Sequence, residues 1–317
     1  MSIPNKTKIP LLIVSGVFLG LIIATILMSS TISDGNVNPK NNNIELYDTP
    51  YQVFQPTVPT EVWFADEKVP IEFFDVYESL DRELIINTYR HSSTILYVKR
   101  AKRYFPIIEP ILQANGIPDD FKYLCVAESG LDHAISPAGA TGFWQFMKTT
   151  GREYNLEVNN YIDERYNIIK TTSAACNYLN NAYKKFGNWT LAAVSYNMGM
   201  AGLQRRLDQQ KVDNYWDLYL TPEPARYVYR IVALKIVMSN PELYGFNIPT
   251  EDLYHPINYY PIIVDTTINN LQEFALKFGI NYKLLKIFNP WIRDTMLMNR
   301  SGKEYTLIIP DSTARVR

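Results

Sequence analysis

One glutamate, Glu128, lies in an apolar stretch, YLCVAESG, at residues 123–130. Counted from Phe121, the residues Leu124, Cys125 and Glu128 follow at helical intervals of three, four and seven, so the carboxylate shares a face with apolar side chains. Burial disfavours the charged form of a carboxyl group, and the negative end of a helix dipole disfavours it further. Both effects predict a group that keeps its proton and donates it, as a general acid for a glycosidic oxygen must.

The residues that follow Glu128 suit a ligand cleft. The run SPAGATG at 136–142 offers small residues that let the backbone approach a ligand, and Gln145 follows between two aromatic residues. Later, SYNMG at 195–199 places hydroxyl and amide groups at a helix end. Each pattern is common by itself. The alternative remains that Glu128 pairs with an arginine or turns to solvent at the end of its helix.

The cysteines and histidines indicate little other chemistry. Two cysteines and three histidines are scattered without zinc spacing, so we expect no metal. Cys125 with His133 as base would form a peptidase-like pair, but Cys125 precedes a helix end, where no feature activates a thiol. A disulfide between Cys125 and Cys176 and two buried free thiols both stay open.

Composition and charge limit the classes of function. The 317 residues are 47% hydrophobic, which allows one large or two modest domains with a real core. The formal net charge is -1, from 31 basic and 32 acidic residues, so no overall field would attract nucleic acid. We therefore expect no nucleic-acid partner.

The N-terminal segment indicates export. After Lys6 and Lys8, residues 10–28 are uncharged and mostly apolar, which as a helix is close to the thickness of a bilayer core. We expect residues 1–33 to be a signal anchor, with a cleaved export signal as the alternative. The preceding lysines place the rest of the chain outside the cytoplasm. Polar, proline-rich residues 34–70 are interpreted as a tether.

The elements that must position these residues are mainly helical. Apolar spacing predicts two helices within 71–115 and further helices at 119–129, 143–149, 165–186, 189–197 and 227–239. Gly130 is expected to end the third helix in the left-handed conformation, and Asn188 to cap the helix that follows it. No alternating strand pattern precedes residue 260. After that point the order strand, helix, helix, strand predicts a small α+β module, βααβ, at 259–312.

Taken in order, the motifs resemble the soluble-lytic-transglycosylase domain. They are ESG at 128–130, SPxGAxGxWQF at 136–146, YNxG at 196–199, and Glu223 followed by YV at 227–228. The resemblance implies a goose-type, lysozyme-like helical domain at 71–250. It also implies peptidoglycan strands as the substrate, a location in the cell envelope, either membrane-anchored or secreted to the periplasm, and no cofactor.

Roles are carried over position by position. Glu128 matches the single catalytic acid/base, which protonates the oxygen between N-acetylmuramic acid and N-acetylglucosamine and then takes the proton of the C6 hydroxyl as a 1,6-anhydro ring closes. Substrate binding falls to Ser129, Gln145, Tyr196, Asn197 and Tyr227. The shaping of the cleft falls to Gly139, Gly142, Phe143 and Trp144. Glu223 has either a role in the site or a structural salt bridge.

Three readings of function stay open. The first is the lytic transglycosylase, the second is a hydrolytic muramidase of the same fold, and the third is a catalytically silent peptidoglycan-binding protein.

The tail from Ile262 to Pro310 resembles a LysM domain through the FNP step at 288–290 and the ending YTLIIP at 305–310. That resemblance implies binding of glycans that contain N-acetylglucosamine. A module that docks on the catalytic domain or on another protein is the alternative.

Overall fold

The computed structural model describes residues 53–311, 314 and 315. The expected anchor at 1–33, and the expected tether up to residue 52, lie outside these residues. Across the part of the chain that is described, no helix is long and apolar enough to cross a membrane.

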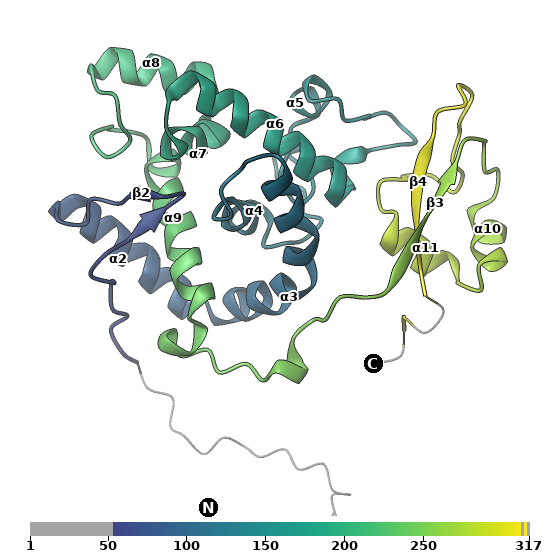
Figure 1. The fold of residues 1–317 in the computed structure, drawn as a ribbon, viewed down its shortest axis with the longest axis horizontal. Coiled ribbons are helices and arrows are strands. Elements are labelled where there is room, and N and C mark those ends of the chain that lie inside the picture. The colour runs from purple at the N-terminus through teal and green to yellow at the C-terminus, as the bar shows by residue number, and fades with distance from the viewer. Residues whose placement is uncertain (1–52, 312–313, 316–317) are drawn as a thin grey trace, which may run out of the picture. The chain divides into compact units, whose positions relative to one another are not determined.

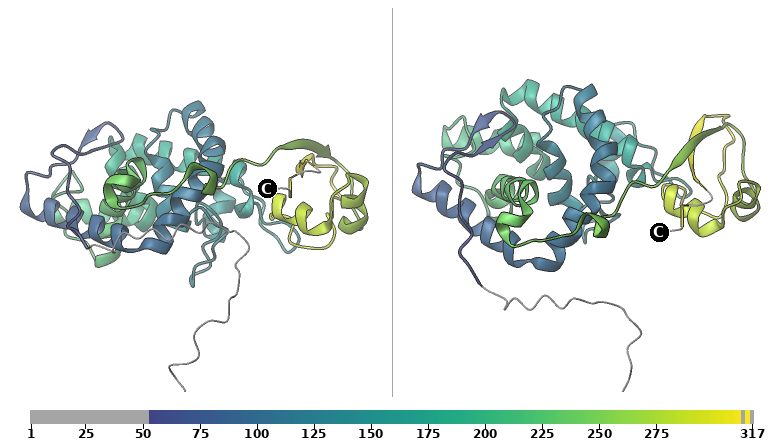
Figure 2. Two further views of the ribbon diagram at one scale, coloured as in Figure 1. Left: turned by 90° about the horizontal axis from the view of Figure 1, so that it is seen from below. Right: turned by 60° about the horizontal axis from the view of Figure 1, so that its bottom comes forward.

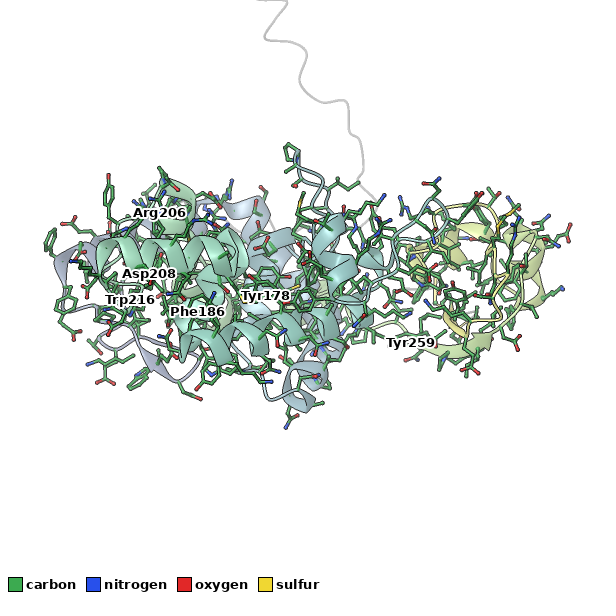
Figure 3. The ribbon with its side chains drawn as sticks, turned by 90° about the horizontal axis from the view of Figure 1, so that it is seen from above. Tyr178, Phe186, Arg206, Asp208, Trp216 and Tyr259 are labelled. Atoms are coloured by element: carbon green, nitrogen blue, oxygen red, sulfur yellow. The ribbon has the colours of Figure 1, made fainter. Side chains whose placement is uncertain are left out.

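The central domain is a ring of helices around the helix that carries Glu128. The surrounding helices are α2 (Phe74–Tyr89), α3 (His91–Ala114), α6 (Ile168–Phe186), α7 (Trp189–Met198) and α9 (Pro222–Ser239), and the inner one is α4 (Phe121–Ser129) (Figures 1 and 2). Helix α4 packs against α3 and α9, and α9 also packs on α2. The helical domain also contains α5 (Lys148–Glu153) and α8 (Met200–Gln210). Figure 3 labels Arg206 and Asp208 of α8, and Tyr178 and Phe186 of α6. The predicted mainly α fold is thus confirmed.

Local signals account for the ends of these helices. Gly130 ends α4 with φ 62° and ψ 29°, the left-handed conformation that glycine adopts without a Cβ penalty. The Asn188 side chain accepts a hydrogen bond from Leu191 N and caps α7. Asn167 does the same for α6, so that helix begins at Ile168, three residues later than predicted. A 3₁₀ turn, Glu164–Tyr166, precedes it.

Residues 54–70 do not form a tether. They contain a small antiparallel hairpin, β1 (Trp63–Phe64) and β2 (Glu67–Lys68), and Phe64 and Val69 belong to the buried core. The carboxylate of Glu67 accepts a hydrogen bond of 2.9 Å from Thr190 N at the start of α7, where the helix dipole favours an anion. The expectation of a tether was wrong here because these contacts join residues more than a hundred positions apart.

Two further predictions about helices were wrong. The aromatic stretch at 143–149 is mostly a tight turn, and α5 starts only at Lys148. Gln145, with φ 48°, has a left-handed backbone that no helix interior accepts. Helix α8 was not predicted, and α9 begins at Pro222 rather than at 227, with proline in the first turn where its missing N–H costs nothing.

The C-terminal module has the predicted βααβ order. Strand β3 (Tyr259–Val264) pairs antiparallel with β4 (Tyr305–Pro310), with Tyr259 opposite Pro310 and Val264 opposite Tyr305. Between them lie α10 (Leu271–Lys277) and α11 (Tyr282–Phe288). The buried amide of Asn289 ties α11 to β4, because its Nδ2 donates to Ile308 O at 2.7 Å and its Oδ1 accepts from Ile308 N at 2.8 Å.

The module shares its core with a segment of the helical domain, residues 157–166, which we call the bridging segment. Ile162 and Tyr166 are buried in the same cluster as Leu285 and Trp291. Asp163 N donates to Trp291 O at 2.8 Å, and Lys303 Nζ lies 2.6 Å from a carboxylate oxygen of Glu157. The alternative of a module that docks on the helical domain is therefore supported by direct contacts.

Candidate active site

Glu128 lies in the last turn of α4 and its side chain is half-buried. Tyr227 lies in the second turn of α9 and is 1% exposed. Its hydroxyl donates a hydrogen bond to Glu128 Oε1. Burial raises the pKa of Glu128 to about 7, although the hydrogen bond from Tyr227 lowers it. At neutral pH the carboxyl group is therefore divided between its protonated and ionised forms, so it can either donate or accept a proton.

Two further charges act on Glu128. The positive charge of Arg230 lowers its pKa, and the negative charge of Glu223 raises it. Arg230 and Glu223 form an ion pair at 3.2 Å, in which the Glu223 side chain is 61% exposed. Glu223 therefore takes the structural salt bridge that was one of its two predicted roles, while its charge still reaches the acid.

The tight turn after α4, residues 139–146, contains the residues predicted to shape the cleft. Phe143 and Trp144 are fully buried, so they support the turn from behind. Trp144 Nε1 donates to Thr172 Oγ1 of α6 at 2.9 Å. Gly142, with φ 83°, packs so closely on the next segment that a Cβ there would lie 2.0 Å from Arg165 O, and only glycine fits. Gly139 also has a positive φ, 87°, but open space beside it.

The predicted substrate-binding residues lie around this turn, with different degrees of freedom. Tyr196 donates from its hydroxyl to Trp144 O at 2.8 Å. Burial raises the pKa of Tyr196 well above its usual value, and the nearby charge of Glu128 raises it further. Asn197 is partly exposed at the end of α7. Ser129 Oγ donates weakly to Cys125 O at 3.3 Å. The side-chain nitrogen of Gln145 is committed to the turn itself, since it donates to Ala134 O and Gly142 O at 3.0 and 2.8 Å.

The side chain of Arg165 anchors this turn, a role that was not predicted from the sequence. It is 8% exposed, and its Nη1 donates to Gly139 O and Phe146 O at 3.0 and 3.1 Å, one bond at each end of the turn. Asp163 holds the guanidinium from the other side through a bidentate pair, with distances of 2.9 and 2.7 Å. The signal was present as an Asp-x-Arg spacing, but its target is some twenty residues away and carries no local trace.

The thiol of Cys125 is a poor nucleophile. It is fully buried, burial raises its pKa well above the ordinary value, and its sulfur faces Phe143 O at 3.4 Å. Burial also lowers the pKa of His133 to about 4. Both cysteines are free. Among the described residues, no group of three or more His, Cys, Asp or Glu side chains is arranged to hold a metal ion.

Two protein families match parts of this chain. Residues 105–219 match the family model described as transglycosylase SLT domain, and residues 260–313 match the soluble lytic transglycosylase C-terminal LysM-like domain. These two stretches are therefore similar to an SLT domain and to a LysM-like module, the two resemblances that the motifs predicted.

Individual relatives of known name are also similar to this chain. The chain is 28% identical over 239 residues to membrane-bound lytic murein transglycosylase D of Escherichia coli strain K12, an alignment that covers 74% of this chain and 51% of the relative. The protein of the same name from Escherichia coli O6:H1 gives the same values. A putative tributyltin chloride resistance protein of Alteromonas sp. strain M-1 is 25% identical over 114 residues, 35% of this chain and 55% of that protein. The chain spans about half the length of these curated relatives.

Proposed function

We propose that this protein is a lytic transglycosylase that cleaves the β-1,4 bond between N-acetylmuramic acid and N-acetylglucosamine in peptidoglycan. The observation that carries the proposal is Glu128, a half-buried carboxyl group whose pKa is raised to about 7 and which a buried tyrosine holds in place. The SLT domain match and the name of the Escherichia coli relatives support the same activity.

The mechanism uses one carboxyl group twice. Protonated Glu128 gives its proton to the glycosidic oxygen as the bond to C1 breaks, and positive charge develops at C1. The Tyr227 hydroxyl then stabilises the carboxylate that is left. This carboxylate takes the proton of the muramoyl C6 hydroxyl while the C6 oxygen bonds to C1. The product carries a 1,6-anhydro ring, no water is consumed, and Glu128 ends protonated again.

Among the residues that the structure describes, the second carboxylate that ordinary glycosidases need has no clear candidate. Glu223 acts on Glu128 electrostatically, but it is mostly exposed and paired with Arg230. Asp132 follows the helix end and pairs with Arg100 at 2.7 Å. Both observations favour the internal C6 hydroxyl over an activated water, and so favour the lyase over the hydrolytic muramidase.

We further propose a location in the cell envelope, with the helical domain outside the cytoplasm and residues 10–28 as the anchor. The basis is the apolar run behind two lysines and the name of the membrane-bound relatives. Fractionation of cells that produce the full-length chain tests this, because an anchored protein sediments with membranes and resists extraction by salt.

The decisive experiment is product analysis. Purified glycan strands are digested with the full-length protein, and the ends are weighed by mass spectrometry. Anhydro ends support the proposal, whereas reducing ends, heavier by one water molecule, would establish the hydrolase. Glu128→Gln should lower kcat by roughly 10²- to 10⁴-fold, and the exposed Glu153→Gln is the matched control that should not. Product formation that survives Glu128→Gln would refute the site.

A further inference from the structure

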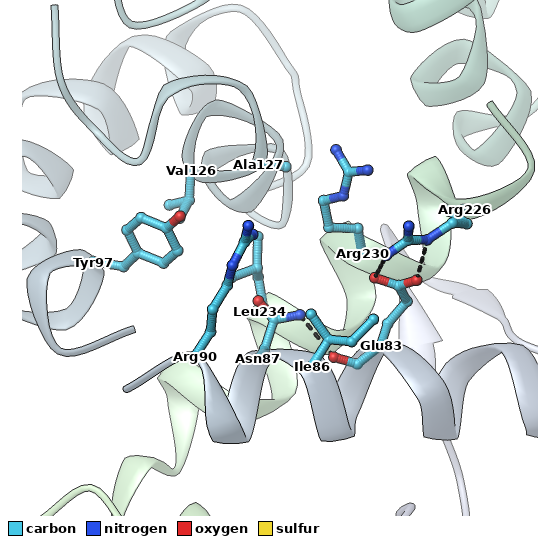
Figure 4. A pocket seen from close by; sticks show the side chains of 10 residues that line it. All are labelled: Glu83, Ile86, Asn87, Arg90, Tyr97, Val126, Ala127, Arg226, Arg230 and Leu234. Carbon is cyan, nitrogen blue, oxygen red and sulfur yellow. Dashed lines mark hydrogen bonds and ion pairs between the residues drawn. The ribbon is translucent and has the colours of Figure 1, made fainter. Parts of the chain in front are cut away.

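A pocket of about 290 Å³ lies beside the acid and is lined by α2, α3, α4 and α9. Three of its lining residues are arginines, Arg90, Arg226 and Arg230, and one is acidic, Glu83. Figure 4 shows Arg90, which directly follows α2, pointing towards Val126 and Tyr97, while Arg230 of α9 lies on the other side of the same space. We call it the arginine pocket.

The charges in the arginine pocket do not balance. Glu83 is 1% exposed and accepts Arg226 through contacts of 2.7 and 3.3 Å, and it also accepts Arg82 at 3.3 Å. Arg230 has the exposed Glu223 as its partner. Within the described residues, no hydrogen bond or ion pair is made by the Arg90 guanidinium. The pocket thus presents an excess of positive charge and a guanidinium with all of its donors available.

The arginine pocket adjoins Glu128 in sequence and in charge. Ala127, which lines the pocket, directly precedes Glu128. Arg230 lines the pocket and also acts on Glu128 electrostatically. A substrate bound at Glu128 therefore brings its neighbouring substituents to the arginines, so the anion that fits here is one that the substrate carries.

We propose that the arginine pocket binds a carboxylate of the peptide stem attached to N-acetylmuramic acid, with Arg90 as the principal contact. This rests on the proposed function. A guanidinium fits a carboxylate through two parallel hydrogen bonds, which gives both affinity and orientation. Of the two sugars, N-acetylglucosamine is neutral, whereas N-acetylmuramic acid bears a lactyl ether that continues into a peptide with free carboxylates. The pocket would therefore select strands that keep their stems.

The test compares two substrates and three proteins. The substrates are glycan strands with stem peptides and the same strands after removal of the stems by an amidase. The proteins are the full-length wild type, Arg90→Met, which keeps an unbranched apolar stem without the charge, and Arg205→Met as control. Arg205 is exposed on α8, away from the pocket lining.

Arg90→Met should raise KM for stem-bearing strands by about tenfold, the loss of one hydrogen-bonded charge pair, and change KM for stem-free strands less than about twofold. Arg205→Met should change neither. Equal effects on both substrates, or no effect on either, would overturn the proposal. Loss of anhydro products from wild-type protein on both substrates would instead refute the proposed function.

Binding gives a readout without turnover. In the Glu128→Gln background, calorimetry with an N-acetylmuramoyl tripeptide should show about tenfold weaker binding when Arg90→Met is added. The same tripeptide with its carboxylates amidated should bind both proteins equally weakly. If amidation leaves the affinity of the Glu128→Gln protein unchanged, the pocket does not read a carboxylate.

Discussion

Glu128 should cost the protein stability at neutral and alkaline pH. Its pKa is raised from 4.5 to about 7 by burial, so the folded state binds its proton more tightly than the unfolded state does. The contribution of Glu128 to stability is therefore most favourable below pH 4.5, becomes less favourable as the pH rises from 4.5 to 7, and is constant above 7. Since one pKa unit corresponds to 1.36 kcal/mol, the full cost is about 3 kcal/mol, and about 2 kcal/mol once partial solvent access is allowed for.

Glu128→Gln removes this cost because the amide is neutral at every pH. The free energy of unfolding of the variant should exceed that of the wild type by about 2 kcal/mol at pH 8 and match it at pH 4. The measurement is urea denaturation of both full-length proteins in the same detergent at several pH values, with Glu153→Gln as control. A difference that does not change with pH, or a variant less stable than wild type at pH 8, would refute the assignment of a half-buried Glu128 that holds its proton up to about pH 7.

Three further predictions concern the same framework. Tyr227→Phe removes a hydrogen bond that lowers the pKa of Glu128, so the alkaline limb of the kcat/KM profile should move up by about one pH unit; a downward move would contradict it. Gly142→Ala should lower the free energy of unfolding by about 4 kcal/mol in urea denaturation, because its Cβ would lie 2.0 Å from Arg165 O. Gly139→Ala, which has open space beside it, should lower it by only about 1 to 2 kcal/mol. Equal losses would show that the contact with Arg165 O is unimportant. Ile162→Ala should lose about 3 kcal/mol and loosen the module, while Ile169→Ala, 42% exposed, should lose less than about 1 kcal/mol; similar losses would argue against a shared core.

Much of the acid's environment could be predicted because it is local. The helical spacing from Phe121 to Glu128 and the following Gly130 lie within ten residues, and both the inward direction and the left-handed cap agree with the structure. The short strands of the C-terminal module and its two helices likewise carry their own patterns.

The supports of the site could not be predicted because they come from distant residues. Arg165 donates to carbonyl groups at 139 and 146, and Arg90 lines the pocket beside Glu128 from the junction between α2 and α3. The hairpin at 63–68 has the composition of a linker, and its place in the fold depends on the contact of Glu67 with α7, more than a hundred residues away. The tight turn defeated the helical prediction because two positive φ values, at Gly142 and Gln145, interrupt an apolar run.

The shared core between the module and the bridging segment bears on reach. A wall-binding module on a loose linker searches a volume set by the length of that linker, and its effective concentration at the enzyme falls as the linker grows. Here Trp291 bonds to the backbone of Asp163, and Lys303 holds Glu157. Residues 247–258 therefore join two bodies that are already fastened elsewhere. Lengthening that connection with glycine and serine should leave the distance between a bound glycan and the scissile bond unchanged.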